Sequence, residues 1–175
     1  GLESDSEMNT PKHIMPGNVL DRIVASKIEH LRDTRSMIPL PQIRSTAENG
    51  PPVTDFLASL STNCISLIAE MKRSSPSGGE LLPDLDPASM ARVYARAGVA
   101  AISVLTEREF FHGSTNDIRD ARSAAVIHGV PVLQKDFIFD EYQIYEARAA
   151  GADAVLLIAS IIDSALLRSL LDLIN

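Results

Sequence analysis

Residues 130–159, VPVLQKDFIFDEYQIYEARAAGADAVLLIA, contain the pattern that decides the fold. The apolar run at 130–135 predicts a strand, 141–150 is typical of a helix, and 154–159 is a second apolar run. Gly151, directly after the helical segment, can adopt the left-handed conformation that ends helices. A buried strand, a helix and another buried strand in this order predict a βα unit of a parallel sheet.

The same alternation of strands and helices extends from residue 66 to residue 175. It predicts strands at 66–72, 101–105, 130–135 and 154–159, and helices at 87–97, 115–127, 141–150 and 164–174. Four such units fit two architectures: an open doubly wound sheet, or the first half of a βα barrel, which needs about 250 residues when complete. Chain length favours the open sheet, whereas the contents of the loops favour the barrel.

A helical extension is predicted at 18–60, ahead of the βα units. Apolar residues recur at helical spacing between 20 and 31, with Asn18 as a plausible N-cap, and Pro39 and Pro41 stop this helix. Within the extension, 42–52 is expected to be a linker and 55–60 a short helix. The polar residues 1–17 are expected to form a disordered leader, and 61–175 to contain the βα units.

Composition excludes several classes of protein. The 175 residues are 45% hydrophobic and 22% charged, as in an ordinary soluble domain. The net charge of −7 argues against nucleic-acid binding, and no apolar run is long enough for a membrane span. Cys64 is the single cysteine, which excludes an internal disulfide and fits a reducing, cytoplasmic setting. The four histidines are scattered, so no metal site is expected.

Charged residues at strand ends are the candidates for chemistry. Because strand side chains alternate, Glu70 and Lys72 share one face at the carboxyl end of the first predicted strand, and Lys135 ends the third. Sites of βα folds are built at this end of the sheet. If both faces point inward, the three residues converge, and two lysines with one glutamate suit an anionic substrate.

Two loops could contribute to binding. The Ser- and Gly-rich loop at 73–79 could hold a carboxylate or phosphate through hydroxyl and backbone N–H groups, although a plain turn is the simpler interpretation. It has neither a Walker A nor a dinucleotide pattern. The loop at 106–114 contains Phe110 and Phe111, which either close a barrel mouth by packing or form a wall for an aromatic substrate.

Several separate segments resemble, in order, the motifs of indole-3-glycerol phosphate synthases. They are IAEMKRSSPSG at 68–78, ISVLTE at 102–107, FHGS at 111–114, VLQKDFI at 132–138, YQIYEAR at 142–148 and GADAVLLI at 151–158. The resemblance runs in register from about residue 20 to residue 175. The helix at 20–38 resembles the N-terminal extension that these enzymes place over the barrel mouth.

The resemblance implies a TIM barrel enzyme of tryptophan biosynthesis, of which this chain would contain the first four βα units. The family converts 1-(2-carboxyphenylamino)-1-deoxyribulose 5-phosphate to indole-3-glycerol phosphate with release of carbon dioxide and water, and it needs no cofactor. In the family, later strands supply a catalytic glutamate, an asparagine and most of the phosphate site. None of these lies in the 175 residues, so this chain alone would hold half an active site.

The resemblance also implies roles for individual residues. Lys135 would be the general acid, Lys72 would hold the substrate carboxylate, and Glu70 would orient and balance the two lysines. Three further residues would contribute to substrate binding: Ser75, Phe111 and Leu156.

Two alternatives remain open. One is a related phosphate-binding barrel enzyme of amino-acid biosynthesis. The other is an inactive half-barrel that serves as a folding or interaction module and self-associates through its open sheet edges. In a half-barrel, Leu156 and Ile158 should face the interior, Val155 and Leu157 should face helices, and Leu156 should be unusually exposed.

Overall fold

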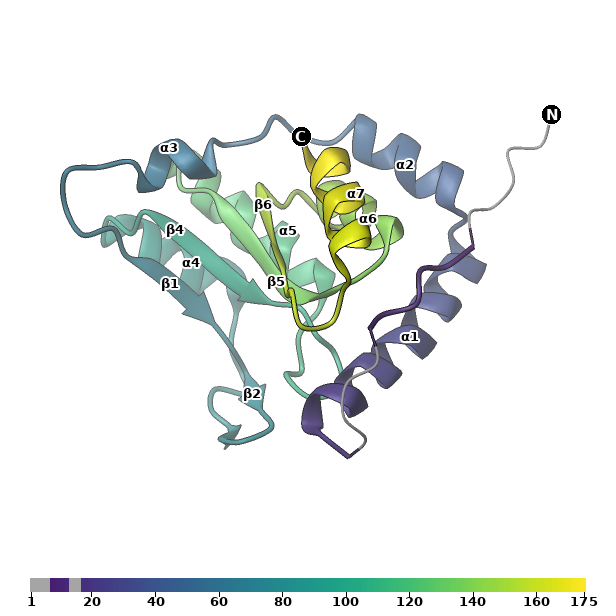
Figure 1. The fold of residues 1–175 in the computed structure, drawn as a ribbon. Coiled ribbons are helices and arrows are strands. Elements are labelled where there is room, and N and C mark those ends of the chain that lie inside the picture. Colours follow the sequence, from purple (N-terminus) through teal and green to yellow (C-terminus); the bar gives the residue numbers. More distant parts are fainter. Residues whose placement is uncertain (1–6, 13–16) are drawn as a thin grey trace.

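The structure, a computed structural model, describes residues 7–12 and 17–175 (Figure 1). Residues 1–6 and 13–16 of the expected leader lie outside the described residues. Two backbone N–H groups in the described part of that segment donate hydrogen bonds to the rest of the chain. The Asn9 N–H donates to Asp140 Oδ2 at 2.7 Å, and the Lys12 N–H donates to the Ile161 carbonyl at 2.7 Å.

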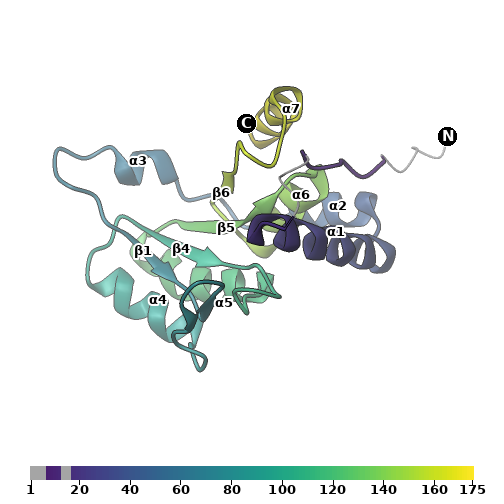
Figure 2. The same cartoon turned by 60° about the horizontal axis from the view of Figure 1, so that its bottom comes forward.

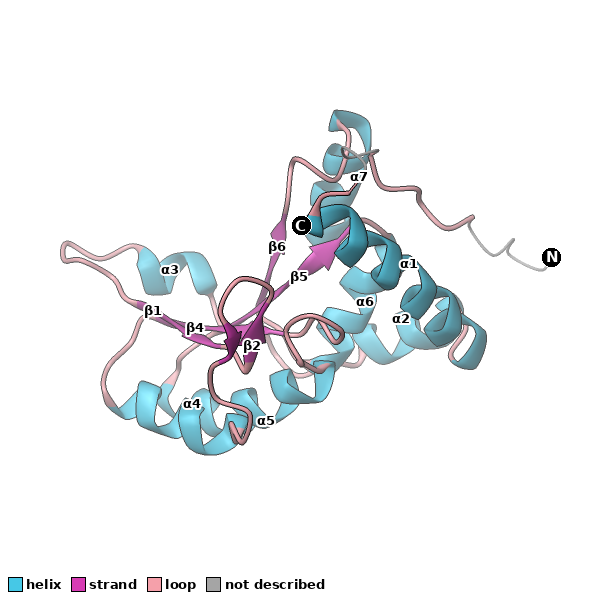
Figure 3. Ribbon diagram, turned by 90° about the horizontal axis from the view of Figure 1, so that it is seen from below, coloured by secondary structure: helices cyan, strands magenta, loops and turns pink. Residues whose placement is uncertain are grey.

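Four parallel strands form the main sheet, in the spatial order β1 (Ile68–Met71), β4 (Ala101–Leu105), β5 (Val132–Ile138) and β6 (Ala154–Leu157). This order follows the sequence, as in a barrel wall, whereas a doubly wound sheet reverses direction part-way. The sheet bends, so that β6 stands away from the plane of β1 and β4 (Figure 3). A small hairpin, β2 (Ser74–Ser75) with β3 (Gly79–Glu80), follows β1.

Helices cover one face of the sheet. They are α4 (Pro87–Arg96), α5 (Thr115–Ala125), which continues as the 3₁₀ turn η1 (Val126–His128), and α6 (Glu141–Ala150); α7 (Ser164–Ile174) follows β6. Outward-facing strand residues such as Met71, Val104 and Val132 pack against Ala91 of α4 and Ala121 of α5 in one buried cluster. Glu70 of β1 and Lys135 of β5 lie on the opposite face.

The loops between helices and strands have the expected chemistry. Gly129 and Gly151 follow η1 and α6 with φ of 67° and 94°, the left-handed region that only glycine adopts at little cost. Ser114 and Asp140 each begin a helix with a complete capping box. These local signals account for the close agreement of the predicted bounds of α5 and α6 with the structure.

Three helices precede β1: α1 (Val19–Met37), α2 (Leu40–Glu48) and α3 (Phe56–Leu60) (Figure 2). The expected linker at 42–52 is wrong over most of its length, since α2 occupies 40–48. Pro39 and Pro41 end α1, but they also lie at the N-cap and first turn of α2, where proline is favoured. Ile43 of α2 is buried in a second core cluster together with Ile144 of α6.

The third strand is also longer than expected. The prediction ended it at Lys135, whereas β5 continues to Ile138 and buries Asp136. An aspartate in the middle of a strand weakens the sequence signal, but this carboxylate has partners on two other segments. Within the described residues, no helix is both long and apolar enough to cross a membrane.

Candidate active site

Three charged side chains meet at the carboxyl end of the inner face of the sheet. Glu70 pairs in register with Ser103, which pairs with Leu133, and Lys135 is two residues beyond Leu133 on the same face. Lys135 Nζ donates to Glu70 Oε2 at 2.6 Å, and Lys72 Nζ lies 3.2 Å from Glu70 Oε1. The three residues predicted to converge are therefore in direct contact.

Glu70 holds the two lysines through one oxygen each. Burial alone would raise the pKa of the Glu70 carboxyl, but the hydrogen bonds and positive charges of Lys135 and Lys72 outweigh it and hold that pKa below its usual value. Glu70 is therefore ionised near neutral pH. All three side chains keep 31–41% exposure, so they remain accessible to a bound molecule.

A cavity of about 110 Å³ lies beside this cluster. Its charged lining residues are Glu70, Lys72, Lys135 and Asp136, and its apolar lining residues are Leu105, Phe111, Phe137, Leu156 and Ile158. The rings of Phe111 and Phe137 lie 6.1 Å apart between centroids, tilted by 36°. The aromatic and aliphatic lining thus suits a planar aromatic group, and the two lysines suit an anion.

The last strand presents its side chains as expected. Leu156 and Ile158 line the cavity, and Val155 and Leu157 pack against the buried clusters; Ile158 also contacts the second of these clusters. Leu156 is 36% exposed, high for a leucine in the middle of a strand. The structure therefore brings Leu156 to the same cavity as Phe111.

Ser75 lies apart from the cavity. It belongs to the β2–β3 hairpin, where its hydroxyl accepts a hydrogen bond from the Gly78 N–H at 3.0 Å. It is not among the residues that line the cavity. The hydroxyl shapes the turn of this hairpin in the described chain.

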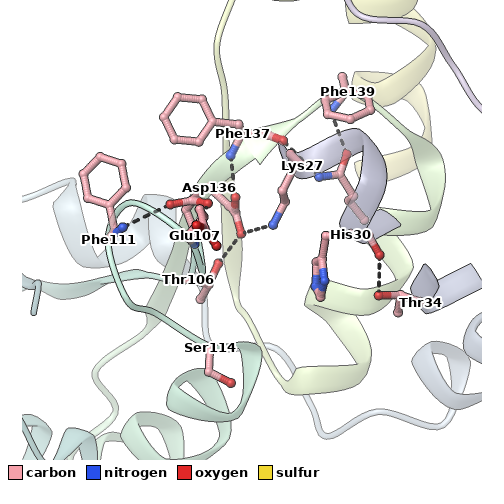
Figure 4. Close-up of polar contacts among 12 residues, drawn as sticks. Lys27, His30, Thr34, Thr106, Glu107, Phe111, Ser114, Asp136, Phe137 and Phe139 are labelled. Atoms are coloured by element: carbon pink, nitrogen blue, oxygen red, sulfur yellow. Dashed lines mark hydrogen bonds and ion pairs between the residues drawn. The ribbon is translucent and has the colours of Figure 1, made fainter. Parts of the chain in front are cut away.

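Sequence reasoning missed a buried polar cluster around Asp136, one of the residues that line the cavity. Asp136 Oδ2 accepts from Lys27 Nζ of α1 at 2.7 Å and from the Thr106 hydroxyl at 2.6 Å, while Oδ1 accepts from the Phe137 N–H (Figure 4). One signal could have found it: Lys27 falls on the same helix stripe as the buried residues Ile23 and Leu31. A lysine there needs a partner.

The described residues contain no cluster of side chains suited to binding a metal ion. Among residues 7–12 and 17–175, no set of three or more His, Cys, Asp or Glu side chains is arranged to hold a metal ion. The one cysteine, Cys64, is exposed and free.

Comparison with known proteins agrees with this architecture. A sequence profile described as indole-3-glycerol phosphate synthase matches residues 20–174. The chain belongs to the indole-3-glycerol phosphate synthase family. It is 43% identical over 150 residues to the indole-3-glycerol phosphate synthase of Neisseria gonorrhoeae, covering 83% of this chain and 56% of that protein. The resemblance seen in the sequence motifs is confirmed.

Other members of the indole-3-glycerol phosphate synthase family give the same result. The enzyme of that name from Mycobacterium avium is 45% identical over 157 residues, which cover 90% of this chain and 57% of that protein. The one from Dehalococcoides mccartyi is 41% identical over 156 residues, which cover 89% and 60%. The chain therefore spans between 56% and 60% of the length of these relatives. The family is a TIM barrel, and the curved parallel sheet is consistent with part of one.

Proposed function

We propose that the protein containing this chain is an indole-3-glycerol phosphate synthase, a carboxy-lyase of tryptophan biosynthesis. It closes the indole ring of 1-(2-carboxyphenylamino)-1-deoxyribulose 5-phosphate and releases carbon dioxide and water. One observation carries the proposal: Glu70 holds Lys72 and Lys135 in the lining of a cavity that Phe111, Phe137 and Leu156 also line. An aromatic ring that carries a carboxylate matches this combination of cationic and apolar lining residues.

The two lysines have different proposed roles. Lys135 is the general acid, which protonates either the carbonyl oxygen during ring closure or the hydroxyl oxygen that leaves as water. Lys72 binds the ring carboxylate until it departs as carbon dioxide, through a charge-assisted hydrogen bond. Glu70, in contact with both Nζ atoms, orients them and balances their charge.

Three other residues have proposed binding roles. Phe111 and Leu156 bound the aromatic ring, since both are apolar residues that line the cavity. Ser75 acts less directly, because its hydroxyl holds the turn of the β2–β3 hairpin that follows Lys72. No cofactor is needed in this scheme, since proton transfer and charge stabilisation suffice.

We further propose that the chain constitutes an N-terminal helical extension at 18–60 and the first four βα units of the barrel at 61–175. The coverage of the relatives and the sequential strand order support this division. The missing half would supply the remaining catalytic groups and the phosphate site. The proposed location is cytoplasmic, where a free, exposed Cys64 is unremarkable.

For the 175-residue chain itself, we propose self-association. Within the described sheet, β1 and β6 each pair along one side only, and Ile68 and Leu156 on the inner face are 43% and 36% exposed. Open strand edges beside exposed apolar residues favour pairing with a second copy. Light scattering should give a mass above that of one chain at micromolar concentration, and a monomer at all concentrations would contradict this part of the proposal.

The function is tested by adding the phosphorylated substrate to the complete protein and following indole fluorescence. Turnover is expected for the complete protein and not for the 175-residue chain. Lys135→Ala should lower turnover strongly. Arg96→Ala, at an exposed position at the end of α4, is the matched control and should leave turnover unchanged. Absence of product from the folded, complete protein would overturn the assignment.

A further inference from the structure

Glu107, in the loop between β4 and α5, has no role in the scheme above, yet it is only 1% exposed. Its carboxylate accepts hydrogen bonds from three consecutive backbone N–H groups: Glu109 at 2.9 Å on Oε1, and Phe110 at 2.7 Å and Phe111 at 3.1 Å on Oε2. Figure 4 shows the contact with Phe111. An acidic side chain that is buried in this way serves the backbone around it rather than the solvent.

The remainder of the loop is closed equally tightly. The Gly113 N–H donates to the Glu107 carbonyl at 2.8 Å. A Cβ at Gly113 would lie 2.2 Å from the Leu105 carbonyl oxygen, so only glycine allows the loop to return so close to the end of β4. His112, directly before Gly113, has φ of 55°, an uncommon value for a residue with a side chain.

The two phenylalanines of this loop contact different parts of the molecule. The Phe110 ring lies against the Arg22 guanidinium of α1, 5.4 Å from the ring centroid. The Phe111 ring lies over the cavity beside Phe137. The Glu107 carboxylate therefore binds the N–H groups of both the residue whose ring faces α1 and the residue whose ring lines the cavity.

We propose that Glu107 is a positioning residue that holds Phe111 against the aromatic ring of the substrate. This inference rests on the proposed function and adds a residue that sets the affinity for that ring. Glutamine at this position offers one acceptor oxygen in place of two, and its NH₂ group would face a backbone N–H. A buried N–H without an acceptor is relieved by movement of the loop, which moves Phe111.

The test uses steady-state kinetics of the complete protein. Glu107→Gln should raise KM about tenfold, the size of one lost aromatic contact, with kcat within a few-fold of the parent, as expected for uniform binding. Glu109→Gln is the matched control, since its side chain is exposed in the same loop and its N–H still reaches Glu107. An unchanged KM in Glu107→Gln would overturn the proposal.

A double-mutant cycle separates positioning from a general structural effect. In a Phe111→Leu background, Glu107→Gln should add less than about twofold to KM, because the ring on which it acts is gone. Full additivity of the two changes would contradict the proposal. If Glu107→Gln does not fold, Glu107→Asp, which retracts the carboxylate by one methylene group, takes its place in the same cycle.

Hydrogen exchange gives a readout that does not depend on activity. The amides of Glu109, Phe110 and Phe111 should be protected in the parent and exchange at least about tenfold faster in Glu107→Gln, while the amides of β4 remain unchanged. Equal protection in parent and variant would overturn the positioning role. A failure of the proposed function is recognised separately, since the unmodified complete protein would then form no indole product.

Discussion

Lys27 Nζ lies 2.7 Å from Asp136 Oδ2, and the two side chains are 7% and 0% exposed. This ion pair joins α1 to the end of β5, across 109 residues of sequence. Asp136 lies between Lys135 and Phe137, both of which line the cavity. The N-terminal extension is therefore tied to the backbone that carries the proposed general acid.

Removing the positive charge of this pair should destabilise the fold strongly. Lys27→Met leaves the buried Asp136 carboxylate with only the Thr106 hydroxyl and a backbone N–H, and should lower the free energy of unfolding by about 3–5 kcal/mol. Urea denaturation at neutral pH measures this. Glu48→Gln, which breaks an exposed i,i+4 pair with Arg44, should cost no more than about 0.5 kcal/mol. Similar losses of unfolding free energy in the two variants would show that the buried pair stabilises the fold no more than the exposed pair does.

The two lysines of the cavity should differ kinetically in the complete protein. Lys135→Ala should lower kcat about 10²–10⁴-fold with a modest effect on KM, because a proton donor acts mainly in the transition state. Lys72→Ala should raise KM as well, because it removes a contact already present in the bound substrate. If Lys135→Ala changed only KM, the general-acid role would pass to Lys72.

Tyr142 should ionise later than an ordinary tyrosine. Burial, helped by the negative charge of Glu146 and opposed by Arg35, raises the pKa of Tyr142 to about 12. A raised pKa means that the folded state keeps the proton longer, so the associated stability is complete below about pH 10 and declines as pH rises towards 12.

The difference in absorbance at 295 nm between the parent and Tyr142→Phe measures this ionisation. We expect almost no difference signal from tyrosinate up to about pH 11. Tyr142→Phe also removes the hydrogen bond from its hydroxyl to the Ile38 carbonyl at 3.0 Å, which should cost about 1 kcal/mol at neutral pH. A difference signal complete at pH 10 would contradict the shifted pKa.

Gly113 should tolerate no side chain. In Gly113→Ala the new Cβ would meet the Leu105 carbonyl oxygen at 2.2 Å and Thr106 Cα at 2.7 Å, both in the backbone. The expected loss of stability is about 3 kcal/mol, at the upper end of the range for overpacking. Gly79→Ala is the comparison, since φ of +65° costs about 1 kcal/mol there with no atom within 4 Å. Equal thermal shifts in the two variants would show that the β4–α5 loop adjusts freely.

Much of the fold was predictable because its signals are local. The predicted helices at 141–150 and 164–174 agree with α6 and α7, and the strand at 101–105 agrees with β4. The linker at 42–52 was wrong because its helix depends on Ile43 and Ala47 being buried, not on a strong propensity of its own. The end of β5 was missed because Asp136 is a poor strand residue until Lys27 and Thr106 provide its partners.

The sequence by itself determined the alternation of strands and helices, that Glu70 and Lys72 share one face of a strand, and that Lys135 ends another strand at the same edge of the sheet. This follows from the twofold period of a strand, which is a property of the backbone. Only the tertiary structure decided three features. Lys27 binds Asp136, Glu107 accepts hydrogen bonds from three backbone N–H groups including that of Phe111, and Ser75 does not line the cavity. Such contacts depend on how the sheet curves and how distant segments pack, which no local pattern specifies.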